Sequence, residues 1–116
     1  MLIGHTELFV RDPHASRRFY EEVLGFELVA VQGENVWVKL GDREILLRPG
    51  TDRESSTRYA DASAAIVLYT DDLAGAVESL RARGLRFDGF DGCEKCPTFR
   101  DPDGHWFQLV NPNDHG

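Results

Sequence analysis

Five side chains with useful chemistry lie on segments that are predicted to be strands: His5, Trp37, Glu44, Trp106 and Gln108. An imidazole and a carboxylate bind divalent metal ions or transfer protons. Indole rings stack on planar aromatic molecules, and an amide forms hydrogen bonds with polar groups. These residue types therefore suit either a metal centre or a pocket for a small aromatic or cationic molecule.

Each candidate also has a purely structural explanation. The two tryptophans can pack against a helix or a dimer partner, and His5 can be an ordinary strand histidine. Glu44 can form a salt bridge with Arg48 or Lys39. The sequence leaves these alternatives open.

The stretch DPDGHWFQLV, residues 101–110, begins as a turn and continues as a strand. Asp-Pro-Asp-Gly is a turn signature, so we expect its two carboxylates to be structural. Because side chains alternate along a strand, Trp106 and Gln108 share one face, and Phe107 and Leu109 share the other. The question is whether Gln108 contacts a ligand or is the neutral remnant of a metal site.

The two cysteines, Cys93 and Cys96, are separated by two residues. This spacing fits a redox pair, half of a zinc site, or no special role. A zinc site needs two more ligands, and no second cysteine pair or paired histidines supply them. Cysteine catalysis needs a base, for which His105 is the candidate close in sequence. The sequence does not decide whether the pair is redox-active.

The composition limits the kinds of partner. A chain of 116 residues with a net charge of −7 is long enough for one domain, and its charge repels nucleic acid and anionic membranes. We expect neither as a partner. The acidic balance either attracts a cationic small molecule or serves solubility. Without a signal-peptide pattern or a long apolar run, the chain is expected in the cytoplasm.

The N-terminal half, about residues 1–50, predicts the element order β-α-β-β-β. A strand over residues 2–10 is followed by a helix that begins after the cap Asp12 and ends at Gly25. Three strands follow, which are separated by turn signals. Their expected ranges are 26–32, 35–40 and 43–49.

A polar stretch, about residues 51–62, has the composition of a surface linker, and the same order then begins again over about residues 63–112. Asp72 caps the second helix and Gly84 ends it, so this helix is one residue shorter than the first. The remaining strands are expected within LRFDG, PTFRD and HWFQLVNP. We therefore predict an α+β fold of two βαβββ modules within one domain, residues 1–116.

Each module has an uncovered sheet face. A single helix covers only one side of a four-stranded sheet, so the other side has reason to pair with a second sheet. Two curved mixed sheets that face each other enclose a cleft, which is a common place for ligands. A homodimer, with or without exchanged modules, is expected.

Three stretches carry a wider resemblance: GHTELFVRDPHASRRFYEEVLGFELV in the first module, and YTDDLAGAVESLRARG and FRDPDGHWFQLVNP in the second. Together with the doubled pattern, they resemble the vicinal oxygen chelate superfamily. This group includes glyoxalase I, fosfomycin resistance enzymes, ring-cleaving dioxygenases and bleomycin resistance proteins. The resemblance covers nearly the whole chain and implies the glyoxalase/bleomycin resistance fold. One such scaffold carries many chemistries.

The resemblance also implies where a metal would bind. His5 matches the first-strand histidine of the metal-using members, and Glu44 is a candidate for the fourth-strand glutamate. Ala65 and Gln108 stand where those members have the second histidine and the last-strand carboxylate. An alanine donates nothing to a metal, and an amide oxygen is a weak ligand. The expectation is therefore no cofactor.

These observations favour a binding protein over an enzyme. The prediction is a bleomycin-resistance-type protein that sequesters an aromatic or cationic drug-like ligand in a metal-free cleft. Trp37, Trp106, Gln108, His5 and Glu44 are the expected ligand-binding residues, and no catalytic residue is assigned. The alternative is a metal-dependent lyase, isomerase or dioxygenase of the glyoxalase type. Its Zn, Ni, Mn or Fe ion would use His5, Glu44 and Gln108.

Overall fold

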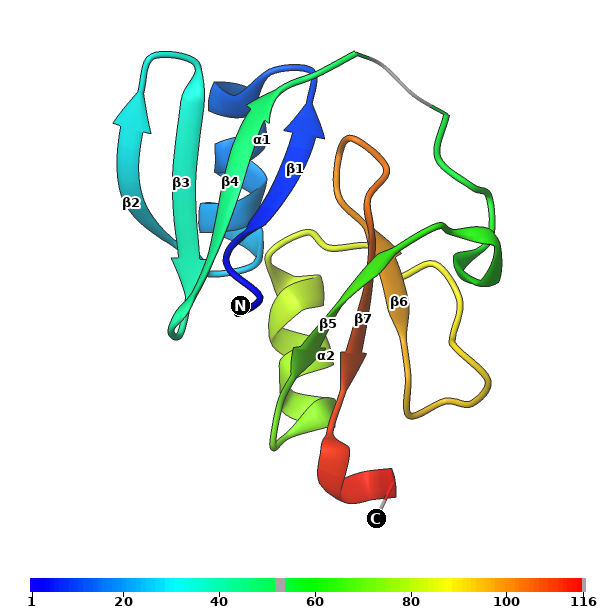
Figure 1. Cartoon of the computed structure of the whole chain (residues 1–116). Helices are drawn as coiled ribbons and strands as arrows, with labels where there is room; N and C mark the ends of the chain where they lie inside the picture. Colours follow the sequence, from blue (N-terminus) through cyan, green and yellow to red (C-terminus); the bar gives the residue numbers. More distant parts are fainter. Residues whose placement is uncertain (52–53, 116) are drawn as a thin grey trace. The chain divides into compact units, whose positions relative to one another are not determined.

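The computed structural model describes residues 1–51 and 54–115, and the chain divides into two compact units, residues 1–53 and 54–116 (Figure 1). The division falls within the segment predicted to be a linker. Residues 52 and 53 of that segment lie outside the described residues. Each unit is described separately below.

The first unit confirms the order β-α-β-β-β. It contains β1 (Thr6–Val10), α1 (Pro13–Arg18), a π-helical turn (Phe19–Val23), β2 (Glu27–Gln32), β3 (Asn35–Leu40) and β4 (Arg43–Pro49). The sheet order is β1-β4-β3-β2, in which β1 and β4 are parallel and the other pairs are antiparallel. The sheet is mixed, as predicted.

The second unit repeats this plan with one strand fewer. It contains a short 3-10 turn (Tyr59–Asp61), β5 (Ala65–Tyr69), α2 (Leu73–Ala82), β6 (Thr98–Arg100), β7 (Trp106–Val110) and a C-terminal 3-10 turn (Pro112–His115). The sheet order is β5-β7-β6, with β5 parallel and β6 antiparallel to β7. The strand predicted within LRFDG is therefore a wrong prediction.

The backbone around Gly89 explains the missing strand. Asp88 donates its amide to the carbonyl of Thr98 at 2.7 Å, and Thr98 donates to the carbonyl of Gly89 at 3.0 Å. The two segments thus lie side by side, with an isolated bridge between Phe90 and Pro97. The φ angle of Gly89 is +83°, which an extended strand does not adopt. The pairing therefore does not continue as a ladder.

The helix ends agree with the sequence prediction, and the first helix adds a π-turn. The side chain of Asp12 accepts hydrogen bonds from the backbone at the start of α1, and that of Asp72 does so in α2. Gly25 and Gly84 have φ angles of +80° and +101°. Leu24 donates to the carbonyl of Phe19, five residues earlier, at 3.2 Å. This wider turn accommodates the extra residue of the first helix.

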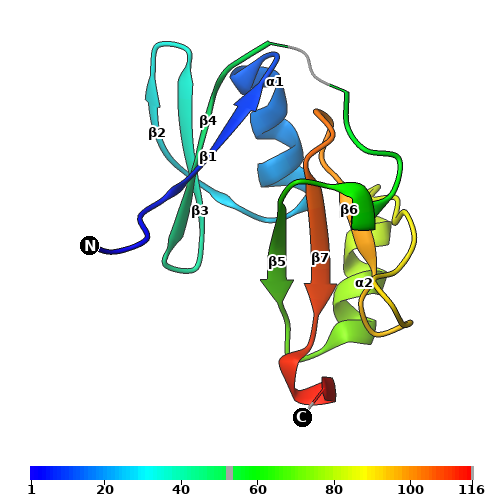
Figure 2. The same cartoon turned by 45° about the vertical axis from the view of Figure 1, so that its right-hand side comes forward.

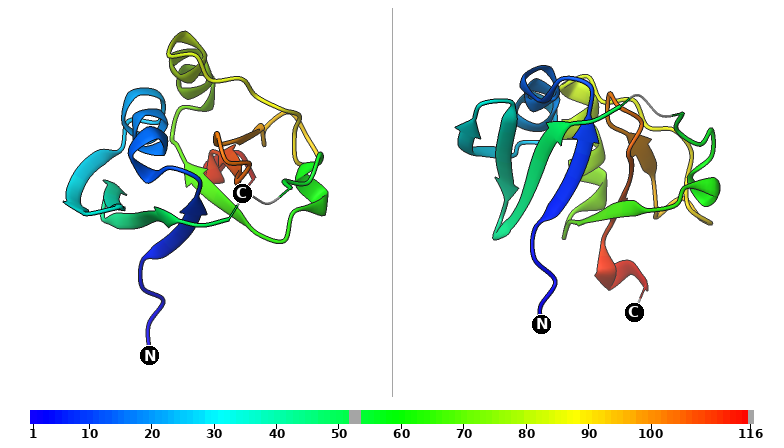
Figure 3. Two further views of the ribbon diagram at one scale, coloured as in Figure 1. Left: turned by 90° about the horizontal axis from the view of Figure 1, so that it is seen from above. Right: turned by 45° about the horizontal axis from the view of Figure 1, so that its top comes forward.

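Each sheet has a buried face and a second face with a different character. The largest fully buried side chains are Tyr20, Leu47, Val10, Val36 and Val38 in the first unit and Phe99 and Phe107 in the second. In the first unit α1 contacts β3 and β4. In the second, α2 and the turn Tyr59–Asp61 lie on opposite sides of the sheet (Figures 2 and 3). In each unit, the sheet face opposite the buried core is the surface on which a ligand can bind.

Candidate ligand-binding pocket

The strand register places Trp106 and Gln108 on the face of the second sheet that is opposite the stacked rings of Phe99 and Phe107. Trp106 pairs with Arg100, and Gln108 pairs with Thr98, so these four side chains lie on one face. Phe99 and Phe107 stack at 5.0 Å on the other face. The alternation expected from the sequence is confirmed.

A short covering segment, residues 55–59, packs on this face at Trp106. The indole Nε1 donates to the carbonyl oxygen of Ser56 at 3.1 Å and lies 2.8 Å from its hydroxyl. The ring of Tyr59 meets the indole edge-on, with 5.7 Å between ring centroids. Only 3% of Trp106 is exposed. The segment predicted to be a surface linker therefore also packs on the sheet.

The turn of residues 101–104 anchors the covering segment. Ser55 donates its hydroxyl to the carbonyl of Gly104 at 2.7 Å. Gly104 has a φ angle of +90°, and a Cβ atom there would lie 2.5 Å from Cβ of Ser55. One carboxylate oxygen of Asp101 accepts the amides of Asp103 and His105. The turn has the structural role predicted for it.

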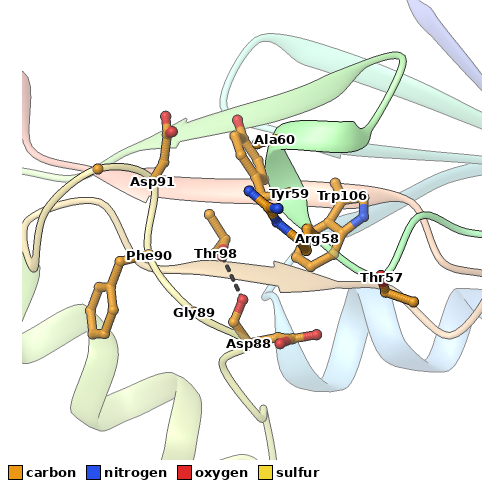
Figure 4. Close-up of a pocket in the computed structure, with 11 residues that line it drawn as sticks. Thr57, Arg58, Tyr59, Ala60, Asp88, Gly89, Phe90, Asp91, Thr98 and Trp106 are labelled. Atoms are coloured by element: carbon orange, nitrogen blue, oxygen red, sulfur yellow. Dashed lines mark hydrogen bonds between the residues drawn. The ribbon is translucent and has the colours of Figure 1, made fainter.

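A pocket of about 320 Å³ lies beside this cover, wholly within the second unit (Figure 4). Residues 57–60 line one side and residues 88–92 the other, with Thr98 and Trp106 contributed by the sheet. The pocket is at the lower end of the usual size range for small-molecule sites. It fits a molecule of a few rings and is too small for a large glycopeptide.

Two carboxylates line the pocket, and they differ in their partners. Asp88 forms an ion pair with Arg100 at 2.8 Å, and the same guanidinium lies over the ring of Trp106 at 4.9 Å. Asp91 instead accepts a hydrogen bond from the neutral amide of Gln108 at 2.8 Å. Within the described residues, no basic side chain forms an ion pair with Asp91. Asp91 therefore offers its negative charge to the pocket.

The role of Gln108 follows from its two partners. Its Nε2 donates to Asp91 and lies 3.1 Å from the hydroxyl of Tyr59. A carboxylate only accepts hydrogen bonds, so the amide must present its N–H groups to Asp91. Gln108 thus joins the two walls of the pocket. Only 9% of its surface is exposed, and its role in ligand binding stays a prediction.

The other candidate residues lie in the first unit. His5 lies 2.9 Å from Glu7, which also accepts a hydrogen bond from Arg48 at 2.8 Å. The rings of His5 and Trp37 meet at 4.6 Å between centroids. The bond from Arg48, and then that from His5, lowers the pKa of Glu7 below its ordinary value. This face carries an exposed polar cluster.

Glu44 does not have the partner that the sequence suggested for it. Arg48 pairs with Glu7 instead of Glu44. Lys39 is the cross-strand neighbour of Glu44, but its ion pair is with Glu27 at 3.8 Å. Glu44 lies exposed at the start of β4, while Ile45 and Leu47 are buried as predicted.

The donor groups do not fit a divalent metal ion in the second unit. Ala65 and Gln108 lie on neighbouring strands and present a methyl group and an amide whose N–H groups face Asp91. In the first unit, the cation beside Glu7 is the guanidinium of Arg48. Within residues 1–51 and 54–115, no three His, Cys, Asp or Glu side chains gather as a metal site.

Three residues that line the pocket or hold its covering segment in place were missed by the sequence reasoning. Tyr59 and Ser56 lie in a stretch whose polar composition indicates only a linker, and Asp91 precedes the cysteine pair. Each reaches the site through a partner far along the chain, either Trp106 or Gln108. Only the aromatic ring of Tyr59 in an otherwise polar stretch is a signal, and it is a weak one.

Comparison with known proteins agrees with this fold. The model of the Glyoxalase/Bleomycin resistance protein/Dioxygenase superfamily matches residues 2–109. The uncharacterized protein YetH of Bacillus subtilis (strain 168) is 25% identical over an alignment of 117 positions that covers 92% of this chain and 95% of YetH. The family model thus covers most of the chain and identifies the superfamily that the sequence resembles.

Solved structures share the fold. A lactoylglutathione lyase from Agrobacterium tumefaciens is 20% identical and has a TM-score of 0.74, with 99% of this chain and 96% of the lyase covered. TnmS3, an antibiotic binding protein from Streptomyces sp. CB03234, is 28% identical with a TM-score of 0.68, and 97% and 98% of the two chains are covered. In the described part of the chain, no helix is long and apolar enough to span a membrane.

Proposed function

This chain belongs to the glyoxalase/bleomycin resistance protein/dioxygenase superfamily, and we propose that it binds a small aromatic cation in the pocket of its second unit without changing it chemically. The observation that carries this proposal is the carboxylate of Asp91, which lines the pocket beside Tyr59 and, among the described residues, is paired with the neutral amide of Gln108 and with no basic side chain.

The lining includes the guanidinium of Arg58, which pairs with Asp61 at 3.9 Å, and its other groups favour a cationic ligand. A carboxylate that is held by an amide keeps its full charge and forms a strong contact with an ammonium or amidinium group. The ring of Tyr59 attracts a positive charge through its face and packs on flat molecules. The ring of Trp106 already carries the guanidinium of Arg100 over its face. Phe90 also lines the pocket, but its ring points away from the other labelled side chains (Figure 4). The overall charge of −7 also favours the approach of a cation.

The similarity to TnmS3 is consistent with binding as the function. That protein is described as an antibiotic binding protein, and its identity to this chain is 28%. The lyase, at 20%, shows the fold alone. An antibiotic of suitable size is therefore the proposed class of ligand. His5, Trp37 and Glu44 lie in the first unit and do not line this pocket, so their role in ligand binding stays a prediction from the sequence.

We propose that binding needs no metal. The positions that the resemblance assigns to a second histidine and a last-strand carboxylate hold Ala65 and Gln108, and Gln108 is engaged by Asp91. Elemental analysis of protein purified without chelators is expected to show no stoichiometric transition metal. One bound ion per chain would overturn this part of the proposal and favour the metal-dependent lyase, isomerase or dioxygenase.

We propose a homodimer as the assembled form. Val67 and Tyr69 are exposed large side chains on β5, which is an edge strand of its sheet. An exposed edge with apolar side chains favours association with another chain. Light scattering during gel filtration is expected to give twice the mass of the chain, and a monomer at high concentration contradicts this.

The binding proposal is tested by tryptophan fluorescence. The variant Trp37→Phe leaves Trp106 as the only tryptophan, so its emission reports on the pocket. Proflavine, a planar aromatic cation, is expected to quench this emission with saturation. Fluorescein, an anion of similar ring size, is expected to bind much more weakly.

A pair of variants separates a specific contact from the general charge effect. Asp91→Asn, in the Trp37→Phe background, keeps an acceptor for Gln108 and removes the charge, so proflavine binding should weaken by about tenfold or more. Asp42→Asn changes the net charge equally at a side chain that is 98% exposed. Equal weakening by both variants, or no saturable quenching by proflavine, would count against the proposed function.

A further inference from the structure

The two cysteines lie in a tight turn at the end of a closed loop. The bridge between Phe90 and Pro97 closes the loop, and Cys96 donates its amide to the carbonyl of Cys93 at 3.1 Å. Such a β-turn brings its outer Cα atoms within about 7 Å, close to the range that a disulfide needs. The two sulfur atoms are already 3.8 Å apart. The backbone is therefore arranged for a bond between them.

The two thiols have different environments. Cys93 is exposed, whereas Cys96 is 8% exposed. Burial, and then the neighbouring thiol of Cys93, raise the pKa of Cys96 above its ordinary value. Cys96 thus stays protonated at neutral pH and is shielded from reagents. Cys93 is the thiol that a reagent in solution meets first.

The imidazole of His115 lies close enough to Cys96 to act as its base. Nε2 of His115 is 3.6 Å from the sulfur of Cys96. The sequence pointed to His105 as the nearest histidine, but the C-terminal turn brings His115 to the cysteine pair. A neutral imidazole can take the thiol proton when Cys96 reacts.

We propose that Cys93 and Cys96 form a reversible intramolecular disulfide by exchange with a low-molecular-weight disulfide. The thiolate of Cys93 attacks one sulfur of the small disulfide, forms a mixed disulfide and releases the first small thiolate. Cys96 then gives its proton to His115 and attacks the sulfur of Cys93, which releases the second small thiolate. Two protein thiols are oxidised, and one small disulfide is reduced to two thiols, which take up the two protons.

The turn is connected to the pocket. Asp91 donates its amide to the carbonyl of Cys96 at 2.8 Å, while its carboxylate accepts the amide of Gln108. A disulfide across the turn restricts the backbone on which Asp91 sits. On the basis of the proposed function, this restriction pre-organises the carboxylate, and ligand affinity should rise by about threefold. The effect on affinity rests on that function, but the disulfide does not.

Intact mass after acid quenching and thiol alkylation tests the disulfide. Reduced full-length protein is incubated with glutathione disulfide. The expected product has lost two hydrogen atoms, carries no alkyl group and returns to the dithiol form with excess glutathione. Alkylation of both cysteines throughout, or a disulfide only between two chains, would overturn the proposal.

Three variants assign the roles of the groups. Cys96→Ser should accumulate a mixed disulfide at Cys93, and Cys93→Ser should react slowly because Cys96 is buried. His115→Gln should slow resolution of the mixed disulfide without slowing its formation. Circular dichroism establishes that each variant is folded. If Cys96→Ser is not folded, the wild-type protein must show the same mixed disulfide transiently during its time course. Absence of that mixed disulfide contradicts the order of steps.

Proflavine titration of the oxidised and reduced proteins tests the link to the pocket. Tighter binding by the oxidised form is expected. Equal affinity of the two forms would overturn the link between the disulfide and the pocket. The mass measurement separately decides whether the disulfide forms. Absence of binding by both forms would instead contradict the proposed function, so the two failures are distinguishable.

Discussion

The two units share one plan but use the sheet face opposite the buried core differently. In the first unit this face carries an exposed cluster in which Glu7 is bound by Arg48 and His5. In the second unit the segment around Ser56 and Tyr59 covers the corresponding face and buries Trp106. The pocket thus arises from the covering segment as much as from the sheet. A repeated fold does not by itself repeat a site.

The two tryptophans offer the strongest test of this difference. Trp106 is 3% exposed, so Trp106→Ala should lower the free energy of unfolding by about 3–5 kcal/mol. Trp37 is half-buried beside His5, and Trp37→Ala should cost about 1 kcal/mol. Urea unfolding monitored by circular dichroism measures both. Equal losses of unfolding free energy would contradict the conclusion that this sheet face is covered in the second unit and exposed in the first.

Substitutions at two glycines test the contact between Ser55 and Gly104, which holds the covering segment in place. Gly84 and Gly104 both have positive φ angles, of +101° and +90°, so alanine introduces backbone strain of about 1–2 kcal/mol at each. At Gly104 the new Cβ also collides with Ser55, whereas nothing lies within 4 Å of that position at Gly84. Gly104→Ala should therefore cost about 1–3 kcal/mol more than Gly84→Ala.

The same pair of variants tests the pocket itself. Displacement of the cover by Gly104→Ala should expose Trp106, so its emission shifts to longer wavelength in the Trp37→Phe background. Gly84→Ala should leave the emission unchanged. Identical spectra for the two variants would contradict the role of the Ser55 contact.

Features that depend on local sequence were predicted, whereas features that depend on contacts between distant residues were not. Local patterns were sufficient for the helix caps, for the element order of the first unit and for the shared face of Trp106 and Gln108. The strand expected within LRFDG failed because a positive φ angle at Gly89 interrupts it. The cover was missed because its contacts join residues about fifty positions apart, such as Ser56 and Trp106. Pairings of that kind leave no local pattern in one sequence.

Two glutamines sharpen the comparison of the faces further. Gln108 donates to the carboxylate of Asp91, whereas Gln32 accepts the indole N–H of Trp37 at 3.3 Å on an exposed surface. Gln108→Glu places two carboxylates side by side and should cost about 1–3 kcal/mol at neutral pH. Gln32→Glu keeps an acceptor and should change stability by less than about 0.5 kcal/mol.

The pH dependence of Gln108→Glu has a definite sign. The pKa of the new carboxyl should be higher in the folded than in the unfolded chain, because the neighbouring charge disfavours ionisation. Between these two values the folded state binds more protons, so stability falls as pH rises. Urea unfolding across the acid range is expected to show this loss, and Gln32→Glu serves as the control. A pH profile parallel to that of the control would contradict the pairing of Gln108 with Asp91.

The smallest effect is expected at the exposed cluster of the first unit. Hydrogen bonds from Arg48 and then His5 lower the pKa of Glu7, so its contribution is present at neutral pH and is lost as pH falls through that lowered value. Because solvent and salt screen such surface charges, Glu7→Gln should leave the melting midpoint unchanged within error at physiological ionic strength. At low salt the variant should be slightly less stable than the wild type at neutral pH, and the difference should vanish in acid. A large, salt-independent loss would mean that this face is covered in solution, and the contrast between the two units would then be wrong.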